Sequence, residues 1–302
     1  MIPIAFLVSV IAFFLIQLSP GDPSAFFVSA DAPFEEVERV RQRLGVDQPV
    51  IVQFWKWLGA VVQGDLGVSF FQRRPVVVAF FAALPVTLML AGGGMLVALI
   101  LALPIGIYSA LHQNSLGDHA GTLFIFTGIS MPNFWFGMLL ILLFAVNLGW
   151  LPAQGFLRDA GLIGNIRSLL LPALSLGYPS SALIARMTRS SMLEVLRQDY
   201  VQTARAKGLR SFAVLTRHVF MNAINPILTV VGLVFARMIA GSVVIETVFN
   251  LPGVGQLVVN SVMRRDYPVI QGSMLLTAIM ILIVNLLIDL LYAVFDPRIR
   301  YD

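Results

Sequence analysis

The sequence predicts an all-α fold, a polytopic transmembrane helical bundle, and two observations support this prediction. Of the 302 residues, 58% are hydrophobic and only 12% are charged, whereas a soluble domain carries about 25% charged residues. Six apolar runs also approach or exceed the roughly 20 residues that a helix needs to cross the hydrocarbon core. A charge content this low excludes a soluble enzyme, a nucleic-acid-binding domain and a disordered tail. The chain contains no cysteine, which excludes disulfides and thiolate chemistry.

Six membrane-spanning helices are expected in order along the chain, at residues 2–18, 84–110, 123–146, 169–185, 226–248 and 269–295. The first run could also be a secretory signal peptide, but no Lys or Arg precedes it and no A-x-A-like cleavage site follows it. We therefore expect it to remain as a membrane helix, and the missing basic residues indicate that translation starts a few codons earlier. Several runs contain proline or glycine, either as tolerated residues or as hinges: Pro85, Gly92, Gly93, Gly94, Pro104, Pro132, Pro172 and Pro179.

The segment between the first two spans, residues 19–83, has a more polar composition. A helical pattern begins after Pro33 and continues to Leu44, and Gly45 is a plausible stop. A second helical pattern, rich in aromatic residues, covers residues 52–62. We therefore expect a small folded element outside the cytoplasm.

Basic residues concentrate between the fourth and fifth spans, in residues 186–225, the basic segment. Against only Glu194 and Asp199, it carries seven cations: Arg186, Arg189, Arg197, Arg205, Lys207, Arg210 and Arg217. Because positively charged loops stay in the cytoplasm, we expect the basic segment and both termini, including the tail 296–302, to be cytoplasmic. The loop 111–122 fits this topology less well, since it should also be inside but contains no Lys or Arg.

The sequence contains no arrangement of residues typical of an enzyme. The three histidines do not form a metal-ligand spacing, and no H-E-x-x-H, GxSxG or Walker A pattern is present. We therefore expect no catalytic residue, no metal and no cofactor bound by this chain. If the protein uses ATP and Mg²⁺, partner subunits must bind them.

A few polar residues fall at membrane depth, where charges are costly and usually functional. Arg237 and Glu246 are nine positions apart, which places them on opposite faces of one helix. Arg237 either lines a solvent-filled path and meets a substrate carboxylate, or pairs with a neighbouring helix. Glu246 is expected in a structural or interfacial role near the outer end. Asn285 and Asp289 share a helix face, and we expect them to form interhelical hydrogen bonds.

The basic segment also has internal order. Asp199 can cap a short helix over residues 200–207, and Gly208 can end it. A charge-rich loop is usually only a topology anchor. Here, short helices with small residues on one face favour docking against a partner.

Residues 199–209, DYVQTARAKGL, resemble the EAA-type cytoplasmic loop of ABC importer permeases, in the variant of the dipeptide/oligopeptide branch. Further segments are similar to that branch in the same order: 18–23, 64–69, 130–135, 246–255 with 265–268, and 285–292 with 296–298. The resemblance therefore covers nearly the whole chain. The sequence departs from the general pattern at Gln202 and Thr203, where Glu and Ala are usual, and at His218, where Ile is common.

The resemblance implies a type I ABC importer permease in a bacterial inner membrane, with a five-helix core over residues 84–295. Its partners would be a second homologous permease subunit, two cytoplasmic ATPase subunits, an extracytoplasmic solute-binding protein and the lipid bilayer, with no nucleic acid. By resemblance, the ATPase-docking residues would be Asp199, Tyr200, Thr203, Ala204, Arg205, Ala206, Lys207, Gly208 and Leu209.

The resemblance favours peptides as the transported solutes, moved by alternating access. Relatives in this branch also carry nickel complexes, glutathione or haem, so these solutes stay open as alternatives. A rival from another class is an ion-coupled secondary transporter or channel, which would need no ATPase partner.

Overall fold

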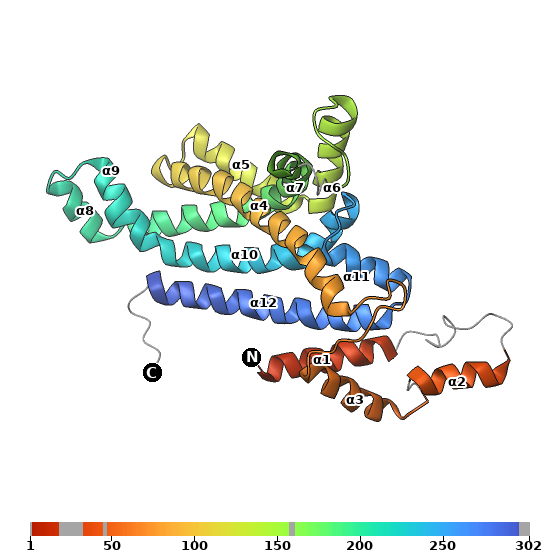
Figure 1. Ribbon diagram of the computed structural model, residues 1–302. Helices are drawn as coiled ribbons and strands as arrows, with labels where there is room; N and C mark the ends of the chain where they lie inside the picture. The colour runs from red at the N-terminus through yellow and green to blue at the C-terminus, as the bar shows by residue number, and fades with distance from the viewer. Residues whose placement is uncertain (1, 18–32, 45–46, 157–160, 296–302) are drawn as a thin grey trace. The chain divides into compact units, whose positions relative to one another are not determined.

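The computed structural model describes residues 2–17, 33–44, 47–156 and 161–295, and helices dominate these ranges (Figure 1). The predicted stop at Gly45, the segment 18–23 and the tail 296–302 lie outside the described residues. In chain order the elements are α1 (Ile2–Gln17), α2 (Phe34–Leu44), α3 (Val50–Val62), α4 (Val76–Leu111), α5 (Leu116–Ser130), α6 (Asn133–Leu140), η2 (Ile141–Asn147), α7 (Gly161–Leu196), α8 (Asp199–Ala206), α9 (Ser211–Ala213), η3 (Val214–Phe220), α10 (Met221–Val248), α11 (Val254–Met263) and α12 (Tyr267–Phe295).

Four helices in the described ranges are long and apolar enough to cross a membrane. They cover Val76–Leu111, Gly164–Leu196, Ser211–Val248 and Tyr267–Ile288. A bent helix pair would make a fifth span if its two halves cross together. The described part of α1, at the N-terminal end, has 16 apolar-rich residues, fewer than the roughly 20 of a typical span, and both of its ends border residues outside the described ranges. The structure therefore agrees with a polytopic bundle and provides four or five candidate spans among the described residues, so the predicted count of six is not fully confirmed.

The third predicted span, residues 123–146, is not one helix. The chain bends by 104° between α5 and α6, because Met131 and Pro132 both adopt extended backbone angles. Proline has no N–H for the helical ladder and disfavours helical geometry in the residue before it. The prediction of a continuous span is therefore wrong at this point.

The other prolines within the predicted spans do not end their helices. Pro172 and Pro179 both lie inside α7, which continues without a break to Leu196. The first part of the basic segment, residues 186–196, is thus the end of this long helix, although the sequence predicted that the fourth span ends at residue 185. The sequence predicted separate short helices in the basic segment, but the part before residue 197 is continuous with α7.

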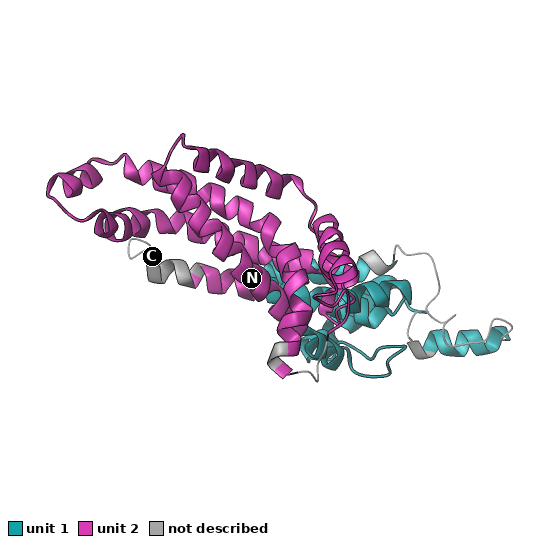
Figure 2. Cartoon of the chain, turned by 90° about the horizontal axis from the view of Figure 1, so that it is seen from above, with its two compact units in different colours: residues 1–85, 256–282 teal, residues 86–255, 283–302 magenta. Residues whose placement is uncertain are grey.

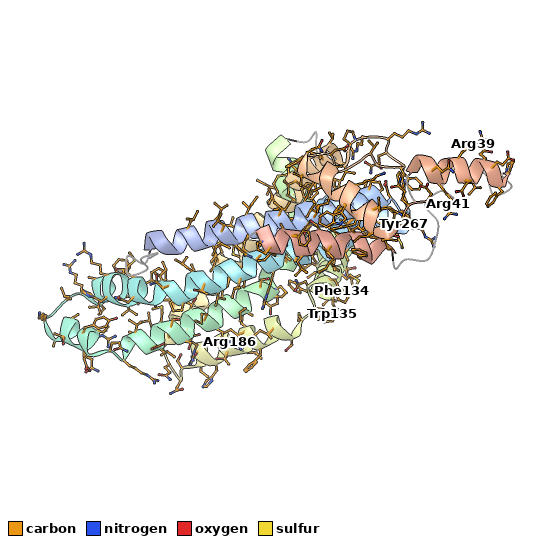
Figure 3. All side chains as sticks on the ribbon, turned by 90° about the horizontal axis from the view of Figure 1, so that it is seen from below. Arg39, Arg41, Phe134, Trp135, Arg186 and Tyr267 are labelled. Carbon is orange, nitrogen blue, oxygen red and sulfur yellow. The ribbon has the colours of Figure 1, made fainter. Side chains whose placement is uncertain are left out.

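Figure 2 shows two compact units of the chain. The first comprises residues 1–85 and 256–282. Within it, α2 confirms the predicted helix from residue 34 to Leu44, and the basic side chains of this helix are visible in Figure 3. The predicted aromatic helix is α3, and Phe54 on α3 stacks edge-on against Phe13 of α1, with 5.4 Å between the ring centroids.

The second unit comprises residues 86–255 and 283–302. Its central element is α7, which packs against α5, α6 and α10. Glycines allow close helix crossings here: a Cβ atom on Gly177 of α7 would lie 2.5 Å from the carbonyl oxygen of Gly94 on α4. Small residues at such crossings let backbones approach when lipid supplies no hydrophobic driving force. This unit contains the basic segment and the predicted intramembrane charges Arg237 and Glu246.

Candidate functional site

The basic segment contains a short helix, α8, which ends where the sequence predicted. Gly208 follows it with a φ angle of +78°, in the left-handed region that glycine adopts at no steric cost. The predicted cap is wrong, however. Gln198 occupies the N-cap position without a side-chain hydrogen bond, and Asp199 is the first helical residue. There the carboxylate is favoured by the positive end of the helix dipole.

One side of α8 is buried and the other is exposed. Val201 and Ala204 are buried, and α8 contacts both α7 and η3. Ala204, expected on the docking surface, therefore packs inside the protein. Tyr200 and Leu209 are 44% and 45% exposed. The remaining predicted docking residues are exposed as well: Asp199, Thr203, Arg205, Ala206, Lys207 and Gly208.

An ion pair joins the beginning of α5 to the end part of α7. Arg189 donates two hydrogen bonds to the Asp118 carboxylate, from Nε to Oδ1 and from Nη2 to Oδ2, both 2.8 Å long. The Asp118 side chain is 4% exposed and that of Arg189 is 28% exposed. Asp118 also accepts from the backbone N–H of Asn114 at 3.0 Å. The loop 111–122 therefore provides a carboxylate that binds one cation of the basic segment.

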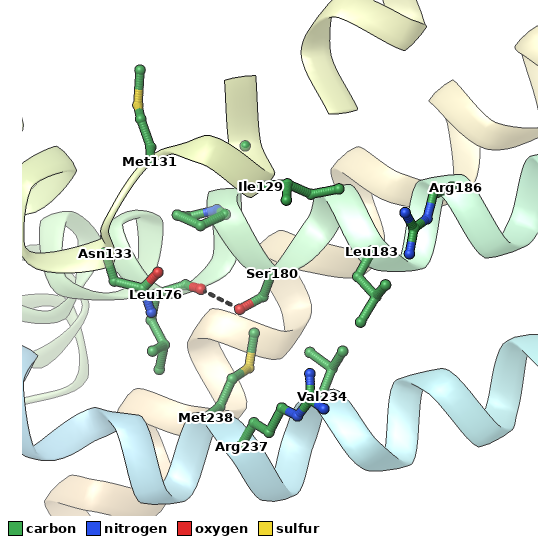
Figure 4. Close-up of a pocket in the computed structure, with 12 residues that line it drawn as sticks. Ile129, Met131, Asn133, Leu176, Ser180, Leu183, Arg186, Val234, Arg237 and Met238 are labelled. Carbon is green, nitrogen blue, oxygen red and sulfur yellow. Dashed lines mark hydrogen bonds between the residues drawn. The ribbon is translucent and has the colours of Figure 1, made fainter. Parts of the chain in front are cut away.

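A cavity of about 360 Å³ lies beside the break between α5 and α6, against α7 and α10. Arg186 of α7 and Arg237 of α10 both line it, and Figure 4 shows their side chains with those of Asn133 and Ser180. Both arginines are exposed. The sequence singled out Arg237 as a possible pathway residue, whereas it treated Arg186 only as a topology signal.

Glu246 is fully buried within the second unit, at 0% exposure. Its carboxylate accepts hydrogen bonds from the Thr87 hydroxyl at 2.7 Å and from the Ser242 hydroxyl at 3.0 Å. The Thr87 oxygen in turn accepts from the backbone N–H of Val254 at 2.9 Å. Glu246 thus links α4, α10 and the start of α11, and its side chain is enclosed within the unit.

The predicted pair on the last helix can be placed only in part. Asn285 is exposed on α12. The side chain of Asp289 lies outside the described residues. An interhelical hydrogen bond from either residue stays a prediction.

In the first unit, two of the segments that resemble the permease branch contact each other. Asp266 is buried and accepts from the Ser69 hydroxyl at 2.5 Å and from the backbone N–H of Phe70 at 3.1 Å. Gly67 has a φ angle of +83°, and a Cβ atom there would lie 3.4 Å from Cβ of Pro268. Segments almost 200 residues apart in sequence thus form one polar contact, which the sequence alone did not pair.

The charged and polar groups described above bind one another or line a cavity, and they do not form a metal centre. Among the described residues, no group of three or more His, Cys, Asp or Glu side chains could hold a metal ion. Long apolar helices, a cavity lined by charged and polar side chains, and an exposed short helix between two spans define a membrane transport permease.

Comparison with known families gives the particular class. Residues 102–301 match the family described as "Binding-protein-dependent transport system inner membrane component", and residues 1–91 match its N-terminal component. The chain therefore belongs to the binding-protein-dependent transport system inner membrane component family. It is a multi-pass inner-membrane protein and the permease component of an ABC importer.

Curated relatives align over the whole chain. A protein of Brucella abortus (strain 2308), whose name is that of a peptide transport system permease, is 43% identical over 307 residues, which cover 100% of this chain and 96% of the relative. The glutathione transport system permease protein GsiC of Escherichia coli (strain K12) is 42% identical over 301 residues, with the same shares covered.

Solved structures of importers share the fold. An inward-facing MetNI methionine ABC transporter matches with a TM-score of 0.61 and 14% identity, over 73% of this chain and 97% of that one. An amino acid ABC transporter with histidines matches with a TM-score of 0.53 and 18% identity, over 74% and 95% of the two chains. The likeness at this identity concerns the fold alone.

Proposed function

We propose that this chain is the transmembrane subunit of an ATP-driven importer of peptide-like solutes, and that α8 is the helix on which an ATPase subunit docks. The observation that carries the proposal is the exposed face of α8 between two long spans. Tyr200 and Leu209 offer apolar contact area there, and Arg205 and Lys207 offer positive charge. A surface that combines apolar and positively charged side chains in this way is typical of a protein–protein interface.

The contacts of α8 explain how docking drives transport. A displacement of α8 is passed to α7 through direct contact and to α10 through η3. Because α7 also packs against α5 and α6, the shift reaches the walls of the cavity. An ATPase dimer that prefers one position of α8 therefore shifts the population between two packings of the bundle.

The complete transporter in this proposal contains further chains. A second homologous permease subunit pairs with this one, two ATPase subunits bind ATP and Mg²⁺ in the cytoplasm, and an extracytoplasmic protein delivers the solute. Both termini are cytoplasmic, as the positive charge of the basic segment favours. The element within residues 19–83 and the loop 250–268 then face the solute-binding protein.

Peptide-like solutes are proposed because full-length relatives carry the names of a peptide permease and a glutathione permease. Glutathione is itself a tripeptide derivative, so both names indicate the same chemical class. Nickel complexes and haem stay as alternatives, and identifying the solute held by the partner binding protein would decide among them.

The docking role of α8 is tested by replacing Gly208 with tryptophan in the reconstituted importer. Nothing lies within 4 Å of a Cβ atom at Gly208, so the ring has room to meet the partner. The backbone strain of a side chain at this positive φ angle has to be measured separately, in a matched control. We expect normal membrane insertion and at least a roughly tenfold loss of ATP-driven uptake, equivalent to about 1.4 kcal/mol. Gly149→Trp is the matched control, because Gly149 also has a positive φ angle and open space around it. Normal uptake by Gly208→Trp would remove α8 from the coupling path.

The ion-coupled alternative is separated from the ATP-driven importer by two measurements. We expect an ATPase subunit to co-purify with this chain. We also expect uptake into proteoliposomes to require ATP on the side of the membrane where the ATPase subunits lie. Uptake driven by an ion gradient without ATP would instead favour a secondary transporter.

A further inference from the structure

The cavity beside α7 and α10 has a pronounced excess of positive charge. Each of these two helices contributes one arginine, Arg186 and Arg237, and the lining contains no acidic residue. Within the described part of the chain, neither guanidinium forms an ion pair or a hydrogen bond. Arg237 lies at membrane depth within the candidate span Ser211–Val248, whereas Arg186 lies at the start of the basic segment. A cation at that depth is costly unless it faces water, a lipid headgroup or an anion.

Arg186 has a second property besides its topology charge. Its helix, the candidate span Gly164–Leu196, has 33 residues, which at 1.5 Å per residue make about 50 Å, more than the roughly 30 Å of the hydrocarbon core. Arg186 can therefore lie on the cytoplasmic side, as expected for the basic segment, and still line the same cavity as Arg237, which comes from a different helix (Figure 4).

The remaining lining has the composition of a binding site for a polar organic solute. Asn133 and Ser180 bring neutral hydrogen-bonding groups, and the Ser180 hydroxyl donates to the carbonyl of Leu176 at 2.8 Å. Val234 and Met238 add apolar surface. Guanidinium groups match carboxylates through paired hydrogen bonds. Two guanidinium groups beside neutral polar and apolar side chains therefore fit a solute that carries carboxylate groups on a peptide-like body.

We propose that this cavity is a carboxylate subsite of the transport path and that the importer prefers anionic peptide-like solutes over neutral ones. The proposal rests on the proposed function, since it assigns a substrate class to the same permease. Arg186 and Arg237 attract the carboxylates, and Asn133 at the α5–α6 break provides a neutral contact. The preference would act in addition to the selection made by the solute-binding protein.

The charge of the cavity can be measured directly because the chain has no cysteine. Ser180→Cys places a single thiol of this chain in the cavity, and the whole transporter is then labelled in nanodiscs. The probes are an anionic sulfonatoethyl and a cationic trimethylammonioethyl methanethiosulfonate, and mass spectrometry of this chain gives the two rates. We expect the ratio of anionic to cationic labelling to fall by about fivefold or more when Arg237→Gln or Arg186→Gln is added, as the loss of one nearby cation requires. Leu183→Cys, also in the lining, is the second reporter if Ser180→Cys does not assemble.

Two control variants isolate the charge effect. Ser190→Cys lies on an exposed position of α7 outside the cavity, so its labelling ratio should not respond to Arg237→Gln. Arg237→Lys keeps the charge and should keep the ratio at Ser180→Cys. The proposal would be overturned if the labelling ratio were unchanged in both arginine-to-glutamine variants. It would also be overturned if neither reagent reached the thiol at either reporter position in any nucleotide state.

Uptake then separates the subsite from the general function. The tripeptides Ala-Glu-Ala and Ala-Gln-Ala are supplied at saturating concentration with the binding protein, whose own affinity for each is measured separately. We expect Arg237→Gln to lower uptake of the glutamate peptide relative to the glutamine peptide by about fivefold or more, since one charge contact is lost. Equal effects on both peptides would overturn the subsite while leaving the importer intact. If the native complex takes up no peptide with ATP, the proposed function itself fails.

Discussion

At the scale of single residues, the buried carboxylate of Glu246 restricts the size of the residues that pack against it. A Cβ atom on Gly253 would lie 2.3 Å from Cδ of Glu246, and one on Gly255 would lie 2.5 Å from Cα of Val243. The turn at Gly253 and the first residues of α11, which include Gly255, can therefore approach the carboxylate and α10 only because these two positions have no side chain. This contact gives a physical reason for a glutamate followed by two glycines in the segment 246–255.

Gly253→Ala should destabilise the folded protein, because the added methyl group overlaps the Glu246 carboxylate. Overpacking of this kind costs about 1–3 kcal/mol, and we expect it as a lower thermal unfolding midpoint in detergent. Gly241→Ala is the matched control, since Gly241 lies on α10 and nothing occurs within 4 Å of its Cβ position. A Gly253→Ala protein as stable as the Gly241→Ala protein would contradict the close contact.

The sequence could identify Glu246 as an unusual charge, but not its surroundings. Its position near the end of a predicted span was compatible with an interface, where a carboxylate reaches water. The hydroxyl donors that solvate it come partly from Thr87, which is 159 residues away. Pairing over that separation is a property of the tertiary fold, and it leaves no local pattern in one sequence.

At the scale of elements, local sequence signals predicted the ends of a helix when those ends do not depend on packing against other helices. The boundaries of α2 follow from Pro33 at its start and from its charge pattern. The prolines of the predicted spans show the opposite case. Pro132 ends a helix while Pro172 and Pro179 do not, and the difference depends on whether neighbouring helices stabilise the interrupted backbone.

The ion pair between α5 and α7 allows a prediction about these elements. Arg189→Gln should cost more stability than Asp118→Asn, because Asp118 is nearly buried while Arg189 can turn partly toward solvent. Breaking a buried pair costs about 3–5 kcal/mol when one charge is left without a partner. We expect Arg189→Gln near the lower end of that range and Asp118→Asn at roughly half of it.

The double variant is the control for this prediction. If the two charges interact mainly with each other, Asp118→Asn combined with Arg189→Gln should lose less stability than the sum of the two single changes. Thermal unfolding of all four proteins in the same detergent gives the coupling energy. Strictly additive losses would mean that the two helices are held together by other contacts.

At the scale of the whole molecule, the sequence predicted the class of fold correctly, because low charge and long apolar runs are global properties. The family was predicted correctly by another route, the resemblance of residues 199–209 and the other ordered segments to the permease branch. It did not predict which distant segments meet. The hydrogen bond from Ser69 to Asp266 and the shared cavity of Arg186 and Arg237 arise only from the tertiary fold. The candidate pathway was therefore half predicted: one of its arginines looked unusual in sequence, and the other was hidden among the topology charges of the basic segment.

The orientation of the chain in the membrane is the remaining whole-molecule prediction, and the absence of cysteine makes it measurable. Gln63→Cys lies in the segment between α3 and α4, and Gln202→Cys lies on the exposed side of α8. Both replace an exposed glutamine, so their reactivities are comparable.

Because the seven cations of the basic segment favour the cytoplasm, a membrane-impermeant maleimide added to intact cells lacking the outer membrane should label position 63 and not position 202. Position 202 should react only after the inner membrane is permeabilised. The reverse pattern would place α8 outside the cell, where no ATPase could dock on it, and would overturn both the topology and the coupling role of this helix.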